Sequence, residues 1–263
     1  MSARNRRIPV ALATVIRAQG SVPRRAGAKM LIYADGRTVG SVGGGEMESR
    51  IVVAAQDALG SGQSQVIPYS LVDPGRGDPG VCGGNVEIFV EPYLPQATLY
   101  IFGCGHVGQS LAALGKWLGY RVVAHDDRPD LATADHMPDA DAVLTGPIDD
   151  ILAAEPLDEH TYAALVTRNV VLDRELLPAI LASPVPYIGV MGSRRRWEET
   201  RRLLLADGVS PESLDRITSP IGLELHAETP NEIAVSIMAQ IISLRSTKRV
   251  TSPGDTSREA APN

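Results

Sequence analysis

One stretch, Leu99-Tyr-Ile-Phe-Gly-Cys-Gly-His-Val-Gly108, limits the folds open to this chain more than any other. An apolar run typical of a β-strand leads directly into Gly103-x-Gly105-x-x-Gly108, and residues 109–118 then carry leucines at helical spacing. In a dinucleotide-binding turn, the first glycine permits the tight turn, the second lets backbone approach a pyrophosphate, and the third lets the helix pack on the strand. The stretch therefore predicts a Rossmann-type strand, turn and helix whose helix N-terminus faces an anion.

A second predicted strand, residues 121–124, ends in His125-Asp126-Asp127-Arg128. Asp126 follows Gly103 by 23 residues, close to the roughly 20 expected for the acid that binds a ribose 2′-hydroxyl. Asp126 favours NAD, whereas Arg128 would accept the 2′-phosphate of NADP, so both cofactors stay open. A turn whose glycines serve packing alone, with no nucleotide, is the other interpretation. On the cofactor hypothesis, we expect contacts from Gly103, Gly105, His106, Val107, Gly108, Asp126, Asp127 and Arg128.

Short apolar runs alternate with helical patterns through the rest of this region. The expected strands are 140–144, 162–166 and 185–191, and the expected helices are 148–154, 173–181 and 195–206. Such alternation is typical of a parallel sheet covered by helices. Ligands of these sheets bind beyond the carboxyl ends of the strands. By position, the further cofactor-binding candidates are Thr167, Asn169, Gly192 and Ser193, with Arg168 as an anion-binding candidate.

The residues before this region predict a separate, smaller unit. Strands are expected at 10–17, 29–33, 37–42, 66–72 and 85–90, with one helix at 47–59. A proline-punctuated linker at 91–96 marks the boundary. We therefore predict an α/β protein with an α+β domain at 1–92, a Rossmann-like parallel-sheet domain at 97–245 and a disordered tail at 246–263.

A second anion site is predicted in the N-terminal domain. Gly43-Gly44-Gly45-Glu46 precedes the expected helix, and three glycines there would form a nest of backbone N–H groups. Arg24 and Lys29, on a neighbouring loop and strand, would add positive charge. A tight strand-to-helix connection is the simpler alternative. Cys82, beside two glycines in a long loop, is either a reactive or metal-binding thiolate or an inert cysteine.

Composition narrows the class of protein. The net charge of −6 and the 4% aromatic content argue against a nucleic-acid-binding protein. The two cysteines have no CxxC spacing and predict neither structural zinc nor a disulfide framework, so a cytoplasmic protein with no metal site of its own is expected. No apolar run approaches the ~18 residues of a membrane helix.

Taken together, these motifs resemble the XdhC/CoxI family, accessory proteins for xanthine dehydrogenase and related molybdenum hydroxylases. The segments that carry the resemblance are Gly20–Arg24, Gly40–Glu46, Cys82–Gly84, Phe102–Gly108, Asp126–Arg128, Tyr187–Ser193, Pro220–Leu223 and Thr229–Ile237. The resemblance implies a protein that binds the molybdenum cofactor, protects it during sulfuration and delivers it to an apo-hydroxylase. One segment departs from the family, which usually has Thr-His-Asp-His where this chain has Thr167-Arg168-Asn169-Val170.

Two functional hypotheses follow. The first is a chaperone of the molybdenum cofactor, partnered by a molybdenum hydroxylase and its sulfurase. The second is an NAD(P)-dependent oxidoreductase that reduces an imine or carbonyl of a small metabolite in a cleft between the domains, with Lys29, Cys82 or His106 as the catalytic proton donor. A homodimer is expected in either case.

Overall fold

The structure, a computed structural model, describes residues 8–71 and 83–250, with side chains described as far as residue 245. The chain divides into two compact units. One comprises Met1–Pro95 with Arg245–Asn263, and the other comprises Gln96–Leu244. Within the described residues, no helix is both long and apolar enough to cross a membrane.

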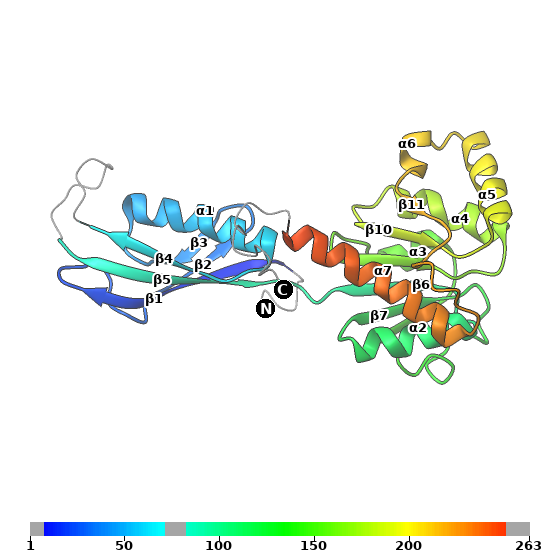
Figure 1. The fold of residues 1–263 in the computed structure, drawn as a ribbon, viewed down its shortest axis with the longest axis horizontal. Coiled ribbons are helices and arrows are strands. Elements are labelled where there is room, and N and C mark those ends of the chain that lie inside the picture. The colour runs from blue at the N-terminus through cyan, green and yellow to red at the C-terminus, as the bar shows by residue number, and fades with distance from the viewer. Residues whose placement is uncertain (1–7, 72–82, 251–263) are drawn as a thin grey trace, which may run out of the picture. The chain divides into compact units, whose positions relative to one another are not determined.

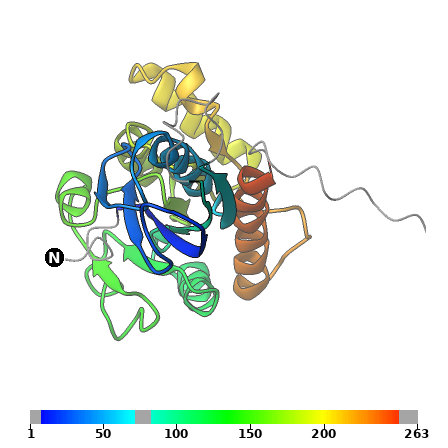
Figure 2. The same cartoon turned by 90° about the vertical axis from the view of Figure 1, so that its left-hand side faces the viewer.

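The N-terminal unit is an antiparallel sheet covered by one helix (Figures 1 and 2). Its elements are β1 (Val10–Gln19), β2 (Lys29–Tyr33), β3 (Thr38–Gly40), α1 (Gly45–Ser61), β4 (Gln65–Ser70) and β5 (Asn85–Tyr93). The strand order is β3-β2-β1-β5-β4. Ala11, Ala13 and Val15 alternate along β1 and are fully buried, together with Met47 and Ile51 of α1. The alternate apolar residues of β1 pack against the apolar face of α1, and together they form the single core of this unit.

The C-terminal unit is a doubly wound parallel sheet. Its elements are β6 (Thr98–Phe102), α2 (His106–Trp117), β7 (Arg121–His125), β8 (Ala142–Leu144), α3 (Ile148–Ala154), β9 (Thr161–Leu165), α4 (Val170–Leu181), β10 (Tyr187–Val190), α5 (Arg194–Ala206), α6 (Pro211–Leu214), β11 (Ile217–Thr218) and α7 (Pro230–Val250). The strand order is β11-β10-β9-β6-β7-β8, and all pairs are parallel. This is the 3-2-1-4-5-6 order of dinucleotide-binding folds, read from the opposite edge.

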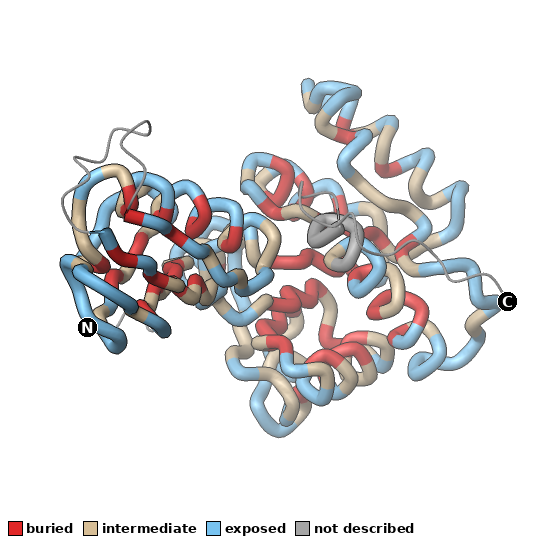
Figure 3. The backbone as a smooth tube through the Cα atoms, turned by 60° about the vertical axis from the view of Figure 1, so that its left-hand side comes forward, coloured by how far each residue is buried: buried red, intermediate tan, exposed pale blue. Residues whose placement is uncertain are grey.

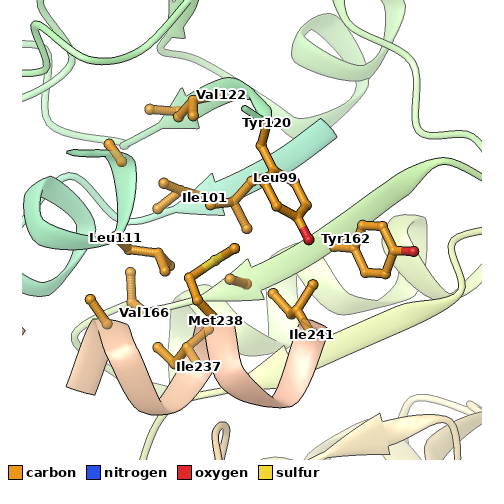
Figure 4. Packing of buried hydrophobic residues seen from close by; sticks show 14 of the residues in the cluster. Leu99, Ile101, Leu111, Tyr120, Val122, Tyr162, Val166, Ile237, Met238 and Ile241 are labelled. Atoms are coloured by element: carbon orange, nitrogen blue, oxygen red, sulfur yellow. The ribbon is translucent and has the colours of Figure 1, made fainter. Parts of the chain in front are cut away.

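Helices cover both faces of this sheet, and the central strands are buried throughout (Figure 3). One face packs on α2 and α7, where Ile237, Met238 and Ile241 of α7 lie against Leu99 and Ile101 of β6 (Figure 4). The other face packs on α3, α4, α5 and α6. Burial on both faces explains why β6 reads as a continuous apolar run instead of an alternating one.

The predicted α/β class, with a parallel Rossmann-like sheet and a smaller N-terminal unit, is confirmed. Several boundaries differ. Strand β5 continues to Tyr93, into the predicted linker, because β1 pairs with it as far as Tyr93, whereas β4 pairs with it only as far as Val90. Pro92 lies beyond that point, where β1 is the partner and a missing N–H is tolerated. Helix α7 continues to Val250, so the first residues of the predicted disordered tail are helical. Neither α6 nor β11 was predicted.

Candidate functional site

The glycine turn after β6 has one glycine that faces open space and two that do not. Gly103 has a φ of +121°, and a Cβ there would lie 2.7 Å from the Val166 carbonyl oxygen. A Cβ on Gly108 would lie 2.0 Å from the Gly103 carbonyl oxygen. A Cβ on Gly105 would meet no described atom within 4 Å. Gly103 and Gly108 therefore allow close packing within the turn, and Gly105 leaves room for a ligand beside the backbone.

Helix α2 begins directly after this turn without a side-chain cap. In the described part of the chain, its N-cap Gly105 makes no capping hydrogen bond, whereas Asn169 and Ser193 cap α4 and α5 with side-chain oxygens. The first N–H groups of a helix have no partner within the helix and carry partial positive charge. The start of α2 is therefore a chemically suitable phosphate site.

A cavity of about 320 Å³ lies in front of this helix start. It is formed at the carboxyl ends of the parallel strands, where β6 and β9 mark the switch in strand order. One part of its wall is apolar, and the other carries two carboxylates and two guanidinium groups. The lining residues are Phe102, Gly103, Gly105, His106, Val107, His125, Asp126, Asp127, Arg128, Val166, Thr167, Arg168, Leu172, Leu176, Met191 and Pro230.

Asp126 is buried and already bonded on both carboxylate oxygens. Oδ2 accepts from the Cys104 backbone N–H at 2.7 Å and from Arg128 Nη2 at 2.9 Å. Oδ1 accepts from the Arg128 backbone N–H at 3.0 Å and from its Nε at 2.8 Å. Burial alone would raise the pKa of Asp126, but the bonds from Arg128 and Cys104 hold it well below the ordinary range. Asp126 thus ties the glycine turn to the end of β7.

Asp127 and Arg168 form a second ion pair at the cavity. Arg168 Nη1 and Nη2 donate to Asp127 Oδ1 and Oδ2 at 2.6 and 2.7 Å. This pairing lowers the pKa of Asp127. Asp127 follows β7, and Arg168 follows β9. The charged wall therefore contains one pair with a buried carboxylate and one pair in which both side chains are exposed.

A buried network holds the loop after β9. Arg196 of α5 donates from Nη2 to Asp173 Oδ2 at 2.6 Å and to Thr167 Oγ1 at 2.6 Å, and from Nη1 to the Thr167 carbonyl oxygen at 3.0 Å. Thr167 Oγ1 in turn donates to Asp173 Oδ1, and Asp173 is fully buried. This network was not predicted, although Arg196 belongs to a run of three arginines. It fixes the backbone that presents Arg168.

The other predicted residues of this sheet edge have structural partners. Asn169 caps α4 by accepting from the Leu172 N–H at 3.0 Å, and Ser193 caps α5. Gly192 has a φ of +156°, and a Cβ there would lie 2.8 Å from Arg196 Cδ. None of these three lines the cavity, whereas Thr167 and Arg168 do.

Two histidines line the cavity and differ in burial. His106, the first residue of α2, is exposed. His125 at the end of β7 is buried, donates from Nε2 to the Gly146 carbonyl oxygen at 3.2 Å, and has its pKa lowered by burial. His125 was missed by sequence reasoning because nothing in its local pattern distinguishes it from a strand residue.

Family models match most of the described chain. Residues 99–241 match the XdhC Rossmann domain, and residues 3–70 match the XdhC and CoxI family. The chain belongs to the XdhC/CoxI family.

Three known proteins illustrate the relationship. The uncharacterized protein YqeB of Escherichia coli K12 is 30% identical over 240 residues, which cover 90% of this chain and 44% of YqeB. This chain therefore spans less than half of that relative. The molybdenum cofactor insertion chaperone PaoD of E. coli K12 is 23% identical over 89% of this chain and 83% of PaoD. A solved structure described as a xanthine dehydrogenase of Bacillus halodurans is 25% identical, with a TM-score of 0.53 and 94% of each chain covered.

In the N-terminal unit, the backbone N–H groups of the family's glycine segment donate to a carboxylate of the same chain. Glu48 Oε1 accepts from the backbone N–H groups of Val42, Gly43 and Gly44 at 3.1, 3.3 and 3.0 Å, and from Ser41 Oγ at 2.7 Å. Partial burial raises the pKa of Glu48, and these bonds outweigh that effect and lower it. The N–H nest that the sequence assigned to an external anion therefore binds a carboxylate of α1.

The remaining predicted residues of the N-terminal unit are dispersed. Gly45 begins α1, and the neighbouring Glu46 has a buried Oε2 without a hydrogen-bond partner among the described residues. Lys29 is exposed on β2 and donates to Thr14 Oγ1 at 2.9 Å. Arg24 is exposed in the loop before β2. Cys82 lies outside the described residues.

Cys104, the second residue of the glycine turn, is a buried thiol. Burial, together with the nearby Asp126 carboxylate, raises its pKa to about 12. A soft metal is bound by a thiolate and not by a thiol. Cys104 is also fully buried and is not among the residues that line the cavity, so it is not placed to contact a ligand there.

Proposed function

We propose that this XdhC/CoxI family protein is an accessory protein that binds the molybdenum cofactor and delivers it to a molybdenum hydroxylase such as xanthine dehydrogenase. The observation that carries the proposal is the cavity at Gly105, where α2 begins without a side-chain cap from the described residues and the space beside the backbone is open. The likeness to the insertion chaperone PaoD supports the same role. A sulfurase and a second copy of this chain are proposed as further partners.

The residues at the cavity fit the phosphate end of a pyranopterin. The backbone N–H groups at Gly105, His106 and Val107 would bind phosphate oxygens. Leu172 and Met191, which are partly exposed on the apolar wall, would lie against the ring system. The bound cofactor would supply the molybdenum centre needed by the acceptor hydroxylase. Because Cys104 is buried and does not line the cavity, Cys82 remains the proposed thiolate for the metal.

A second candidate function is an NAD(P)-dependent oxidoreductase. The observation that favours it is the complete dinucleotide-fold strand order, with a glycine turn after the first strand and acids after the second. Because Asp126 is buried and bonded to Cys104 and Arg128, the ribose contact would fall to Asp127, whose ion pair with Arg168 is exposed. Among the proposed proton donors, His106 lines the cavity.

Calorimetric titration of the full chain with molybdenum cofactor, NADH and NADPH in separate runs tests the two functions. The proposed function predicts tight binding of the molybdenum cofactor, no binding of either nicotinamide, and transfer of the bound cofactor to an apo-hydroxylase that thereby gains activity. Nicotinamide binding without molybdenum-cofactor binding would instead establish the second function.

A matched pair of variants localises the site. Gly105→Ala places a methyl group in the open space at the helix start, whereas Gly60→Ala does the same at an open position in α1. We expect Gly105→Ala alone to weaken binding, because only that methyl group blocks the approach of a phosphate. Equal affinities for the two variants would place the ligand elsewhere.

A further inference from the structure

The two ion pairs at the cavity differ in how firmly each arginine is held. Arg128 contacts a carboxylate whose side chain is 2% exposed and which also accepts from the Cys104 N–H. Arg168 contacts Asp127, and their side chains are 43% and 38% exposed. An exposed ion pair contributes little to stability, because water screens it and competes for both groups. Arg168 is therefore the cation that can change partner at low cost.

The position of the exposed pair matters as much as its exposure. Asp127 follows β7 and Arg168 follows β9, and β6 lies between those two strands in the sheet. The pair therefore joins the loops on either side of the strand that leads into the glycine turn. Both residues line the cavity in front of that turn. A ligand that occupies this cavity meets the pair directly.

The charges at the cavity cancel in this arrangement. Asp126 neutralises Arg128, and Asp127 neutralises Arg168. A phosphate that approaches the start of α2 therefore finds no uncompensated side-chain cation among these four residues. If the Asp127–Arg168 contact opens, the same fork of N–H donors that binds a carboxylate is free for phosphate oxygens, since guanidinium binds both in the same bidentate geometry.

We propose that Arg168 binds a phosphate group of the ligand by partner exchange, and that Asp127 occupies Arg168 until the ligand arrives. The proposal rests on the proposed function only in requiring a phosphate-bearing ligand in this cavity. Its ligand class is a phosphate ester, and either a nucleotide or a pterin phosphate has that chemistry. Arg196 and Asp173 act in this scheme as positioning residues for the loop that carries Arg168.

The test measures affinities of the full-length wild type, Asp127→Asn, Arg168→Gln and the double variant by calorimetry. ADP, adenosine and isolated molybdenum cofactor serve as the probes. Arg174 and Asp207 form a matched control pair, because they are also bidentate, with Nε–Oδ2 and Nη2–Oδ1 distances of 2.5 Å, and similarly exposed at 47% and 35%. Arg174→Gln and Asp207→Asn report any effect of losing a surface ion pair as such.

We expect Arg168→Gln to weaken binding of a phosphate-bearing probe about tenfold or more, from the loss of a charge-assisted bidentate contact. Asp127→Asn should tighten binding several-fold, because Arg168 is then free before the ligand arrives. The double variant should match Arg168→Gln, the control variants should match wild type, and adenosine should show none of these differences.

The opposite results are equally definite. The exchange would be overturned if Asp127→Asn bound the phosphate-bearing probes more weakly than wild type, or if Arg168→Gln bound them equally well. It would also be overturned if neither ADP nor molybdenum cofactor bound to any variant. If molybdenum cofactor binds all variants equally, the exchange fails while the proposed function stands. If ADP shows the expected pattern and molybdenum cofactor does not bind, the exchange stands while the proposed function fails.

Discussion

Two glycine turns in this protein each lead into a helix, and they differ in what their backbone N–H groups contact. In the N-terminal unit, Glu48 of α1 reaches back and accepts from the N–H groups of Val42, Gly43 and Gly44. In the C-terminal unit, the turn at Gly105 lines a cavity. The nearby carboxylate of Asp126 accepts a hydrogen bond from the Cys104 N–H and leaves the N–H groups at the start of α2 without a carboxylate partner among the described residues. A glycine turn before a helix is therefore a possible anion site, and a neighbouring carboxylate decides whether it is available.

Open space beside the helix N-cap does not distinguish the two turns. At Gly43, a Cβ would lie 2.1 Å from the Met47 side chain, so packing fills that side of the first turn. At the N-caps themselves, however, Gly44 of the first turn and Gly105 of the second both face open space. The turns differ instead in their N–H groups, which Glu48 occupies in the first turn, whereas the second turn lines the cavity.

The largest expected effect is that of Gly108→Ala. The new methyl group would lie 2.0 Å from the Gly103 carbonyl oxygen, which is backbone and cannot move without breaking the turn. We expect a loss of more than about 4 kcal/mol in the free energy of unfolding, measured by urea denaturation. A variant as stable as wild type would show that the turn is not packed as described.

Asp126→Ala should lower stability by about 2 kcal/mol, because the Cys104 N–H and Arg128 lose a charged partner. The pH dependence has a defined sign. Since folding lowers the pKa of Asp126, its contribution is present above the ordinary value of 3.8 and is lost as the pH falls toward its lower folded value. The difference in free energy of unfolding between wild type and variant should therefore stay constant from pH 7 to about pH 4 and narrow steadily as the pH falls further, in denaturation curves measured down to about pH 2.

Glu48→Ala should lower stability by about 1–2 kcal/mol, because the N–H nest loses its acceptor. The emptied nest should then bind an external anion, so added sulfate or phosphate should raise the melting temperature of the variant more than that of wild type. This outcome would make the two turns equivalent except for Glu48. Identical responses to the anions would mean that something other than Glu48 distinguishes them.

The smallest effect on stability is expected for Gly105→Ala. Its φ of −73° is compatible with alanine, and the methyl group meets no described atom within 4 Å. We expect the free energy of unfolding to change by no more than about 0.5 kcal/mol, while ligand affinity falls. A large loss of stability would place Gly105 in the packed part of the turn and remove the contrast with Gly108.

Much of the fold could be predicted from the sequence, because its signals are local. Strand β2 and helix α3 have the predicted bounds, and the alternation of strands and helices from β6 to α5 was predicted with shifts of a few residues. The short elements α6 and β11 were not predicted, since a helix of four residues and a strand of two residues have too little pattern to detect.

The candidate site was predicted less completely, for a physical reason. Position in the chain brought Gly105, Asp127 and Arg168 to one sheet edge, as the predicted topology requires. Position in the chain could not show that Asn169 and Ser193 cap helices. It also could not show that Arg196 bonds Asp173, because each of these contacts depends on where the side chains point in three dimensions.

The sequence by itself determined the glycine turn, the parallel sheet behind it and the family, since apolar periodicity and glycine spacing act over a few residues. Only the tertiary structure decided which carboxylate binds which donor. Glu48 fills one N–H nest, Asp126 is bonded to the turn it was expected to serve, and Asp127 holds Arg168 across 41 positions of sequence. Hydrogen bonds and ion pairs form between groups that the fold brings together, so their partners follow from the packing of distant segments.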